Sequence, residues 1–315
     1  MQIADQDNKK TVALVLSSGG ARGLAHIAVI EELEARGYEI TSIAGSSMGA
    51  LVGAFYACGQ LDVYKQWALK LDPWSVLKLM DFTISPYGFV RGRKVFKTLE
   101  TIIPDVDIQD MRIPFVALAT DMHKGKEVVF KKGSMYRAIK ASASVPTVIT
   151  PSQRKGRILV DGGVMTPIPV EFVKRRKKDL LVICDVNGPQ PYKKPKGQTP
   201  PSKAYLDQLQ LVKATWDKFF PANEQHGYKK MGYLDIMAKT MDLMQDKLTQ
   251  LLVTQYQPDL FVQVSRDVGG IFDFHKASEI IAAGRQEFIK KYEQKSLHPK
   301  KKKREKVTAS LSESN

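Results

Sequence analysis

Residues 43–50 have the types and spacing of a site for nucleophilic catalysis. They read G-x-S-x-G, with Ser47 between Gly45 and Gly49, where an apolar strand meets an apolar helix. A serine on such a sharp turn keeps its hydroxyl accessible and its neighbours small. The following helix N-terminus offers unpaired N–H groups and a partial positive charge, which suit an oxyanion. The pattern predicts acyl transfer with Ser47 as the nucleophile.

A second candidate is the loop SSGGARG at residues 17–23, which follows a predicted strand and opens a helix. Backbone N–H groups at such a helix N-terminus can bind an anion. A dinucleotide fingerprint would need glycine at Ser18 and an acid about 20 residues later, near the place of Glu39. A Walker-type phosphate loop would need a Gly-Lys-Ser/Thr ending, which this loop lacks. The third interpretation is an oxyanion hole that faces Ser47.

A carboxylate ends another apolar strand. Residues 157–163 read RILVDGG, so Asp161 is followed by Gly162 and Gly163, which allow a sharp turn and a close approach. Because the carboxyl ends of parallel strands share one crevice, we expect Asp161, Ser47 and the glycine-rich loop to meet there. Taken alone, Asp161 also fits an exposed turn residue.

The elements that must position these residues alternate between strands and helices. This order predicts an α/β fold, a doubly wound, mostly parallel central sheet with helices on both faces. Strands are predicted over residues 11–17, 40–44, 115–120, 127–130, 158–160, 180–186 and 260–264. Helices are predicted over residues 24–35, 48–57 and 134–143.

A further helix is predicted over residues 231–251, where apolar residues recur in steps of three and four. We favour an ordinary helix that packs its apolar stripe on the sheet. A flexible wall of an acyl-chain site, a membrane-facing helix and a dimer helix are the alternatives. The stripe consists of Met231, Leu234, Met237, Met241, Met244, Leu248 and Leu251.

The chain divides into three parts. Residues 1–10 form an N-terminal extension, residues 11–294 one domain, and residues 295–315 a basic tail that we expect to be disordered. The polar N-terminus has no apolar stretch of a secretory signal, and no apolar run is long enough to span a bilayer. Two distant cysteines, Cys58 and Cys184, give no disulfide framework. These features predict a cytoplasmic protein.

The charge is strongly positive, with 48 Lys and Arg against 33 Asp and Glu, a net charge of +15. Basic runs are mostly solvated, which is the favoured interpretation. The alternative is binding to an anionic surface, with peripheral contact at the inner face of the membrane. No segment resembles a nucleic-acid-binding module, so a specific nucleic-acid partner is not predicted.

Taken together, the motifs resemble those of the patatin-like phospholipase family. That family has a glycine-rich oxyanion loop with a basic residue, a G-x-S-x-G elbow and a D-G-A/G turn. Here they read SSGGARG, GSSMG and DGG, in the same order. Residues 140–146, KASASVP, also resemble a family motif, and the resemblance extends over residues 11–290.

The resemblance implies a three-layer fold and a catalytic dyad in which Asp161 accepts the proton of Ser47 directly. It implies an oxyanion hole at Gly19, Gly20 and Arg22, an acyl-enzyme intermediate, and no metal or other cofactor. The implied substrate is a lipid or another fatty-acyl ester: a phospholipid, a lysophospholipid or a simple carboxylic ester. The residues that support the motifs are Ser18, Gly23, Gly45, Gly49, Gly162 and Gly163.

Ser18 departs from the glycine usual in the family, and serine at a positive φ would cost about 1–2 kcal/mol. A Ser-Asp-His triad of the α/β-hydrolase type is one alternative, because His275 follows Asp161 in the required order. A noncatalytic protein that binds lipid or membranes on the same fold is the other. We expect all five histidines to be structural or solvated: His26, His123, His226, His275 and His298.

Overall fold

The computed structural model describes residues 10–83, 88–154, 156–193 and 233–297, with residues 203, 206, 207 and 210 between the last two ranges. The predicted N-terminal extension lies outside the described residues except for Lys10, which opens the first strand. The predicted tail begins at Lys295, whereas the last helix continues to Leu297. Residues 298–315 lie outside the described residues.

A central sheet organises the fold, with the strand order β10-β9-β1-β2-β4-β8-β7 and with β5 also paired to β4. The first five strands in this order run parallel to one another. β5, β8 and β7 are antiparallel to their neighbours. The strands are β1 (Lys10–Leu16), β2 (Tyr38–Ser46), β4 (Phe115–Asp121), β5 (Lys126–Phe130), β7 (Ser152–Arg154), β8 (Arg157–Asp161), β9 (Leu180–Gly188) and β10 (Leu260–Ser265).

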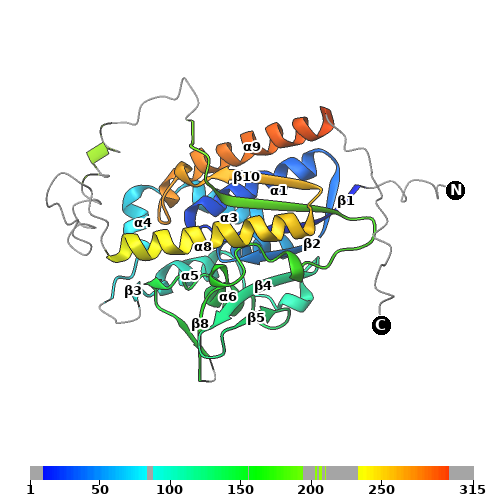
Figure 1. Ribbon diagram of the computed structural model, residues 1–315. Coiled ribbons are helices and arrows are strands. Elements are labelled where there is room, and N and C mark those ends of the chain that lie inside the picture. Colours follow the sequence, from blue (N-terminus) through cyan, green and yellow to red (C-terminus); the bar gives the residue numbers. More distant parts are fainter. Residues whose placement is uncertain are drawn as a thin grey trace, which may run out of the picture.

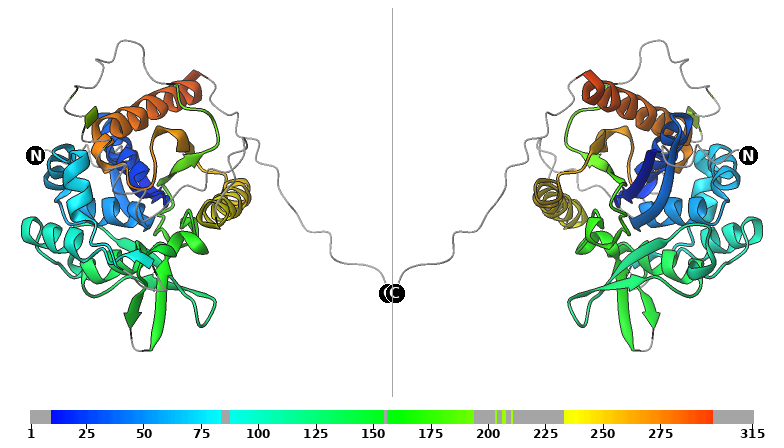
Figure 2. Two further views of the ribbon diagram at one scale, coloured as in Figure 1. Left: turned by 90° about the vertical axis from the view of Figure 1, so that its left-hand side faces the viewer. Right: turned by 90° about the vertical axis from the view of Figure 1, so that its right-hand side faces the viewer.

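Helices cover both faces of the sheet, which makes three layers (Figure 1). Leu14 and Leu16 of β1 face the first helical layer and share its core with Phe288. That layer contains α1 (Ala25–Ala35), α2 (Met48–Ala57) and α9 (Ala277–Leu297). Val15 and Ile183 face the other way and pack toward α8 (Tyr233–Tyr256). In Figure 2, α8 is seen along its axis, and the strands of the sheet lie between α8 and α1. The predicted α/β class and mostly parallel sheet are confirmed.

Shorter elements complete the chain. They are α3 (Leu61–Leu69), α4 (Pro73–Leu79), α5 (Arg93–Ile102), α6 (Met135–Ser142) and the strands β3 (Gly88–Val90) and β6 (Thr147–Ile149), which pair with each other. Ser134 caps α6, because its side chain accepts the N–H of Arg137. The sequence analysis missed α3, α4, α5, α9, β3, β6 and β7.

The predicted apolar stripe of α8 is only partly turned inward. Met237, Met244 and Leu251 are exposed. The inward face instead carries Leu252 and Val253 at its C-terminal end, and polar residues in the middle. The interpretation of this stripe as a core-facing surface is therefore wrong for its exposed members, because polar groups under the middle of α8 attract its polar side chains.

Candidate active site

Ser47 and Asp161 approach each other because two strands share one edge of β4. β2 occupies the first part of this edge, where Ser46 pairs with Leu118. The next residue of β4, Ala119, pairs with Asp161 at the end of β8. β5 pairs along the other edge of the same β4 residues. β2 and β8 therefore meet end to end, and this junction brings together the residue after β2 and the last residue of β8.

The reason we gave for this convergence was wrong. Asp161 was expected at the carboxyl end of a parallel strand, but β8 runs antiparallel to β4. β8 approaches from beyond the C-terminal end of β2, and it ends beside Ser47. The carboxylate thus reaches the crevice through the register of β8 on β4, which a sequence motif does not encode.

Ser47 has the strained backbone of a nucleophile elbow. Its φ of 54° and ψ of −121° are rare for a residue with a side chain and cost about 1–3 kcal/mol. The surrounding hydrogen bonds hold it there: its N–H donates to Ser142 Oγ over 2.8 Å, and its carbonyl accepts the N–H of Ala50 over 3.0 Å. The strained backbone of Ser47 is therefore held in place before any substrate binds.

The two glycines of the elbow are required by space. A Cβ on Gly49 would lie 2.4 Å from the carbonyl oxygen of Leu16 and 2.5 Å from that of Ser17. A Cβ on Gly45 would lie 2.4 Å from the carbonyl carbon of Gly49. Each neighbour is backbone and cannot give way, so the turn excludes side chains at both positions.

Asp161 is buried beside Ser47. Its exposed fraction is 4%, that of Ser47 is 3%, and its Oδ1 accepts the N–H of Gly163 over 2.6 Å. Burial raises the pKa of Asp161 from 3.8 to about 7, while the Ser47 hydroxyl and the Gly163 N–H partly oppose the rise. A carboxylate with a pKa near neutrality suits a general base.

The contact between the two residues is close but not an aligned hydrogen bond. The Ser47 hydroxyl is near enough to lower the pKa of Asp161, yet Asp161 Oδ2 accepts no hydrogen bond of good geometry. The two side chains are therefore adjacent without an aligned hydrogen bond between them.

The glycine-rich loop packs against the elbow. A Cβ on Gly23 would lie 2.3 Å from Met48 Cγ, the residue after Ser47. Within the loop, the N–H of Ser18 donates to Pro167 and that of Ala21 to Ile271. In the part of the chain that the structure describes, the N–H groups of Gly19 and Gly20 donate to no backbone carbonyl outside a helix or strand. These two donors are available to an anion.

The side chain of Arg22 is bound by partners outside the loop. Its Nη2 donates to Asn187 Oδ1 over 2.8 Å and its Nη1 to the carbonyl of Gly269 over 3.4 Å. Burial lowers the pKa of the guanidinium, and Asp242 on α8 partly restores it. The side chain thus ties the loop to the end of β9, and only the backbone of Arg22 can serve the predicted oxyanion hole.

Ser18 carries none of the strain that a positive φ would cause. Among the described residues that are not glycine, only Ser47, Thr147 and Gln257 have a positive φ. The replacement of the usual glycine by Ser18 therefore leaves the loop geometry intact.

α8 contacts the turn after Asp161, which the sequence analysis did not foresee. Gln245 Nε2 donates to the carbonyl of Gly163 over 2.9 Å. The side chain of Arg266, in the turn after β10, pairs with Asp242 and Asp246 on the neighbouring turns of α8. α8 therefore lies over one side of the dyad, and no sequence signal links a glutamine so distant in the chain to this turn.

No histidine among the described residues contributes to the pKa of Asp161. His26 is buried on the first helix, where its Nε2 lies 3.0 Å from the carbonyl of Ser17 and burial lowers its pKa to about 4. His275 lies after β10, where burial lowers its pKa and Asp273 opposes this. His226 and His298 lie outside the described residues.

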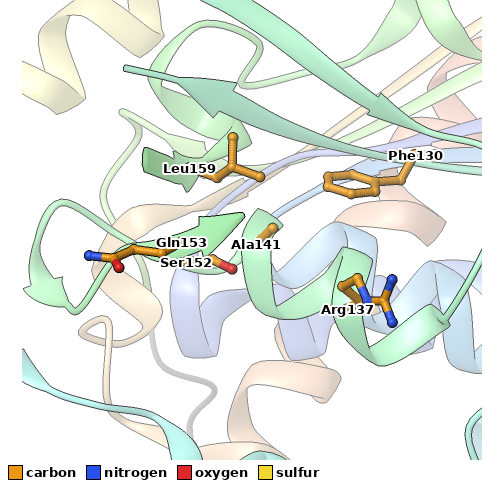
Figure 3. Close-up of a pocket in the computed structure, with 6 residues that line it drawn as sticks. All are labelled: Phe130, Arg137, Ala141, Ser152, Gln153 and Leu159. Carbon is orange, nitrogen blue, oxygen red and sulfur yellow. The ribbon is translucent and has the colours of Figure 1, made fainter. Parts of the chain in front are cut away.

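A cavity of about 220 Å³ lies beside α6 (Figure 3). It is lined by Phe130, Arg137, Ala141, Ser152, Gln153 and Leu159. Neither Ser47 nor Asp161 lines it. Over the described residues, no group of three or more His, Cys, Asp or Glu side chains could hold a metal ion. No helix in those same ranges has the length and apolar character to cross a membrane.

Comparison with known proteins identifies relatives over most of the chain. Uncharacterised NTE family proteins of Mycobacterium bovis and Mycobacterium tuberculosis are 34% identical over 320 residues, covering 87% of this chain and 89% of theirs. Neuropathy target esterase of Drosophila melanogaster is 29% identical over 184 residues, 56% of this chain and 13% of that protein. The structure of VipD from Legionella pneumophila aligns with 91% of this chain and 67% of its own, with 12% identity and a TM-score of 0.46.

The family model described as patatin-like phospholipase matches residues 14–174. This range contains the glycine-rich loop, the elbow with Ser47 and the turn after Asp161. Together with the 34% identity to the mycobacterial proteins, the match supports lipid hydrolase activity in general. The chain belongs to the patatin-like phospholipase family.

Proposed function

We propose that the protein is a serine lipid acyl hydrolase in which Ser47 and Asp161 form a catalytic dyad. The observation that carries the proposal is the pair itself: a strained, buried serine beside a buried carboxyl whose pKa is raised to about 7. A general base with this pKa is partly ionised at neutral pH and can still accept a proton.

The reaction begins when Asp161 Oδ2 accepts the proton of the Ser47 hydroxyl as Oγ attacks the acyl carbonyl carbon. The carbonyl oxygen becomes an oxyanion, which the N–H groups of Gly19 and Gly20 stabilise. When the tetrahedral intermediate collapses, the bond to the leaving alcohol breaks and Asp161 returns the proton to it. Acyl-Ser47 remains.

Deacylation repeats these steps with water. The ionised Asp161 accepts a proton from a water molecule, whose oxygen attacks the acyl carbon of the ester to Ser47. The second oxyanion uses the same donors, and its collapse returns the proton to Ser47 Oγ and releases a fatty acid.

The substrate class is a fatty-acyl ester: a phospholipid, a lysophospholipid or a simpler carboxylic ester. Family membership and the similarity to neuropathy target esterase support this class. Apolar side chains near the site also favour a lipid, because Leu243 and Met244 of α8 are 57% and 53% exposed within two residues of Gln245.

These side chains also favour peripheral contact with an anionic membrane. α8 ends shortly before β10 begins, so its N-terminal half lies toward the carboxyl ends of the parallel strands. The basic cluster at residues 174–178 precedes β9 and lies at the opposite end of the sheet. Replacing Leu243 and Met244 by serine should therefore weaken co-sedimentation with anionic phospholipid vesicles more than replacing Lys177 and Lys178 by glutamine. The reverse order would contradict this arrangement.

The proposed function is tested by the hydrolysis of esters that differ in headgroup and chain length. Wild type should release fatty acid from at least one lipid ester, and Ser47→Ala and Asp161→Asn should each reduce kcat by at least about 1,000-fold. Activity that persists in Ser47→Ala would refute the proposal. A wild type that binds vesicles but hydrolyses no ester would favour the noncatalytic alternative.

A further inference from the structure

Ser18 carries a buried hydroxyl with no hydrogen-bond partner. The residue is 4% exposed, and its Oγ is shielded from solvent with no donor or acceptor in hydrogen-bond geometry. Leaving a hydroxyl buried and unpaired costs about 1–3 kcal/mol. A group kept at this cost inside a reactive site points to a partner that arrives with the substrate.

The backbone of Ser18 is fixed on both sides. Its N–H donates to the carbonyl of Pro167 over 3.0 Å. Its carbonyl accepts Ser17 Oγ over 2.9 Å and Asn187 Nδ2 over 2.7 Å. These bonds fix the backbone, so only rotation about the Cα–Cβ bond can change the position of the hydroxyl.

The hydroxyl lies between the base and the oxyanion donors. A Cβ on Gly163 would be 2.7 Å from Ser18 Oγ and 3.0 Å from Asp161 Oδ1, so both oxygens border the same point. On its other side, Ser18 is joined directly to Gly19 and Gly20, whose N–H groups are available. The hydroxyl thus lies near the carboxyl of Asp161 and belongs to the loop that carries the candidate oxyanion donors.

Asp161 is not the missing partner. Asp161 Oδ1 accepts the Gly163 N–H over 2.6 Å. Ser18 Oγ makes no hydrogen bond to either carboxylate oxygen of Asp161. The bound ester can supply the partner that Ser18 Oγ lacks.

We propose that Ser18 Oγ–H donates a hydrogen bond to the ester carbonyl oxygen as it becomes an oxyanion, as a third donor beside Gly19 and Gly20. This inference rests on the proposed acyl hydrolysis. Because the negative charge is largest in the tetrahedral state, the bond is stronger there than in the bound ester and acts on kcat. The same hydroxyl would be unused in a protein that only binds lipid.

Ser18→Ala tests the proposal with the full-length protein. It should reduce kcat for the best ester substrate about 10- to 100-fold while KM changes less than about threefold. Phosphonylation of Ser47 by a fluorophosphonate should slow by a similar factor, because the phosphoryl oxygen takes the oxyanion position. Ser42→Ala is the matched control: Ser42 is another buried serine, in the middle of β2 and bonded to the Lys174 carbonyl, and its loss should leave both rates unchanged.

The pH profile separates this role from an effect on Asp161. The acidic limb of kcat should have the same midpoint in Ser18→Ala as in wild type, with a lower plateau. A kcat within twofold of wild type would overturn the inference, as would a shifted midpoint with an unchanged plateau. A wild type that hydrolyses no ester and is not labelled at Ser47 would instead refute the proposed function.

Discussion

Asparagine in place of Asp161 should abolish activity and, at neutral pH, make the folded protein more stable. Burial raises the pKa of Asp161 from 3.8 to about 7. Below pH 3.8 the carboxyl is protonated in both states, so it favours neither. Between these values the unfolded chain releases its proton while the folded protein retains it, and stability falls as pH rises. Above about pH 7 the loss is complete.

The size of this effect on folding stability follows from the size of the rise in the pKa of Asp161. A difference of about three pKa units at 1.36 kcal/mol each corresponds to about 4 kcal/mol of folding free energy at pH 8. At pH 4 the raised pKa lowers the free energy of unfolding by less than about 1 kcal/mol. Asparagine has no proton to lose, and its Oδ1 can still accept the Gly163 N–H. The variant should therefore be more stable than wild type by about 4 kcal/mol at pH 8, or roughly 8 °C in Tm.

The assay is denaturant and thermal unfolding of both proteins from pH 4 to pH 8. Asp121→Asn is the matched control, because Asp121 is also buried at the end of β4 but accepts the N–H groups of His123 and Lys124. Its replacement should lower stability at pH 8. A variant Asp161→Asn that is no more stable than wild type at pH 8, or whose advantage is as large at pH 4, would refute the reasoning about a desolvated base.

Two further predictions concern the alternatives and the elbow. His275→Ala should keep kcat within about threefold of wild type in steady-state ester hydrolysis, because no histidine among the described residues affects the pKa of Asp161; a loss above about 100-fold would favour a triad. Gly49→Ala should destabilise the fold by about 3 kcal/mol in urea unfolding, because its Cβ would strike the Leu16 carbonyl. Gly125→Ala, at a φ of +58° with no atom within 4 Å, should cost only about 1 kcal/mol. Equal costs at the two glycines would contradict the steric account.

Most of the parallel core could be predicted from the sequence because its strands are continuous apolar runs. β1 and β4 are buried almost throughout, and both were predicted to within a residue or two. α2 was predicted with its observed bounds, because a glycine turn begins it and a small-residue run fills it. The two glycines of the elbow could also be inferred, because the G-x-S-x-G motif reflects the lack of space for a side chain at both positions.

The parts missed have amphipathic or short sequences with weaker patterns. β3, β6 and β7 are three residues each, too short for a period to show. α5 has only Phe96 and Leu99 buried, and α9 mixes charged residues into a long helix. None of these elements carries the dyad, so their omission left the site prediction unaffected.

The geometry of the site could be predicted only in part. The three motifs indicate which residues come together, but the antiparallel register of β8 on β4, which brings Asp161 to Ser47, depends on pairing between distant segments. The contact of Gln245 with Gly163 depends on how α8 lies over the sheet. The unpaired hydroxyl of Ser18 follows from the bonds around it, which only coordinates reveal.

The rate of Ser47 phosphonylation measured against pH tests most directly whether Ser47 is a nucleophile activated by Asp161. Intact-mass and peptide analysis should find one fluorophosphonate adduct, on Ser47, whose rate of formation rises with a midpoint near pH 7 as Asp161 ionises. Asp161→Asn should remain folded and react at least about 100-fold more slowly at every pH. An adduct on another residue, or a rate on Ser47 that Asp161→Asn leaves unchanged, would contradict the account.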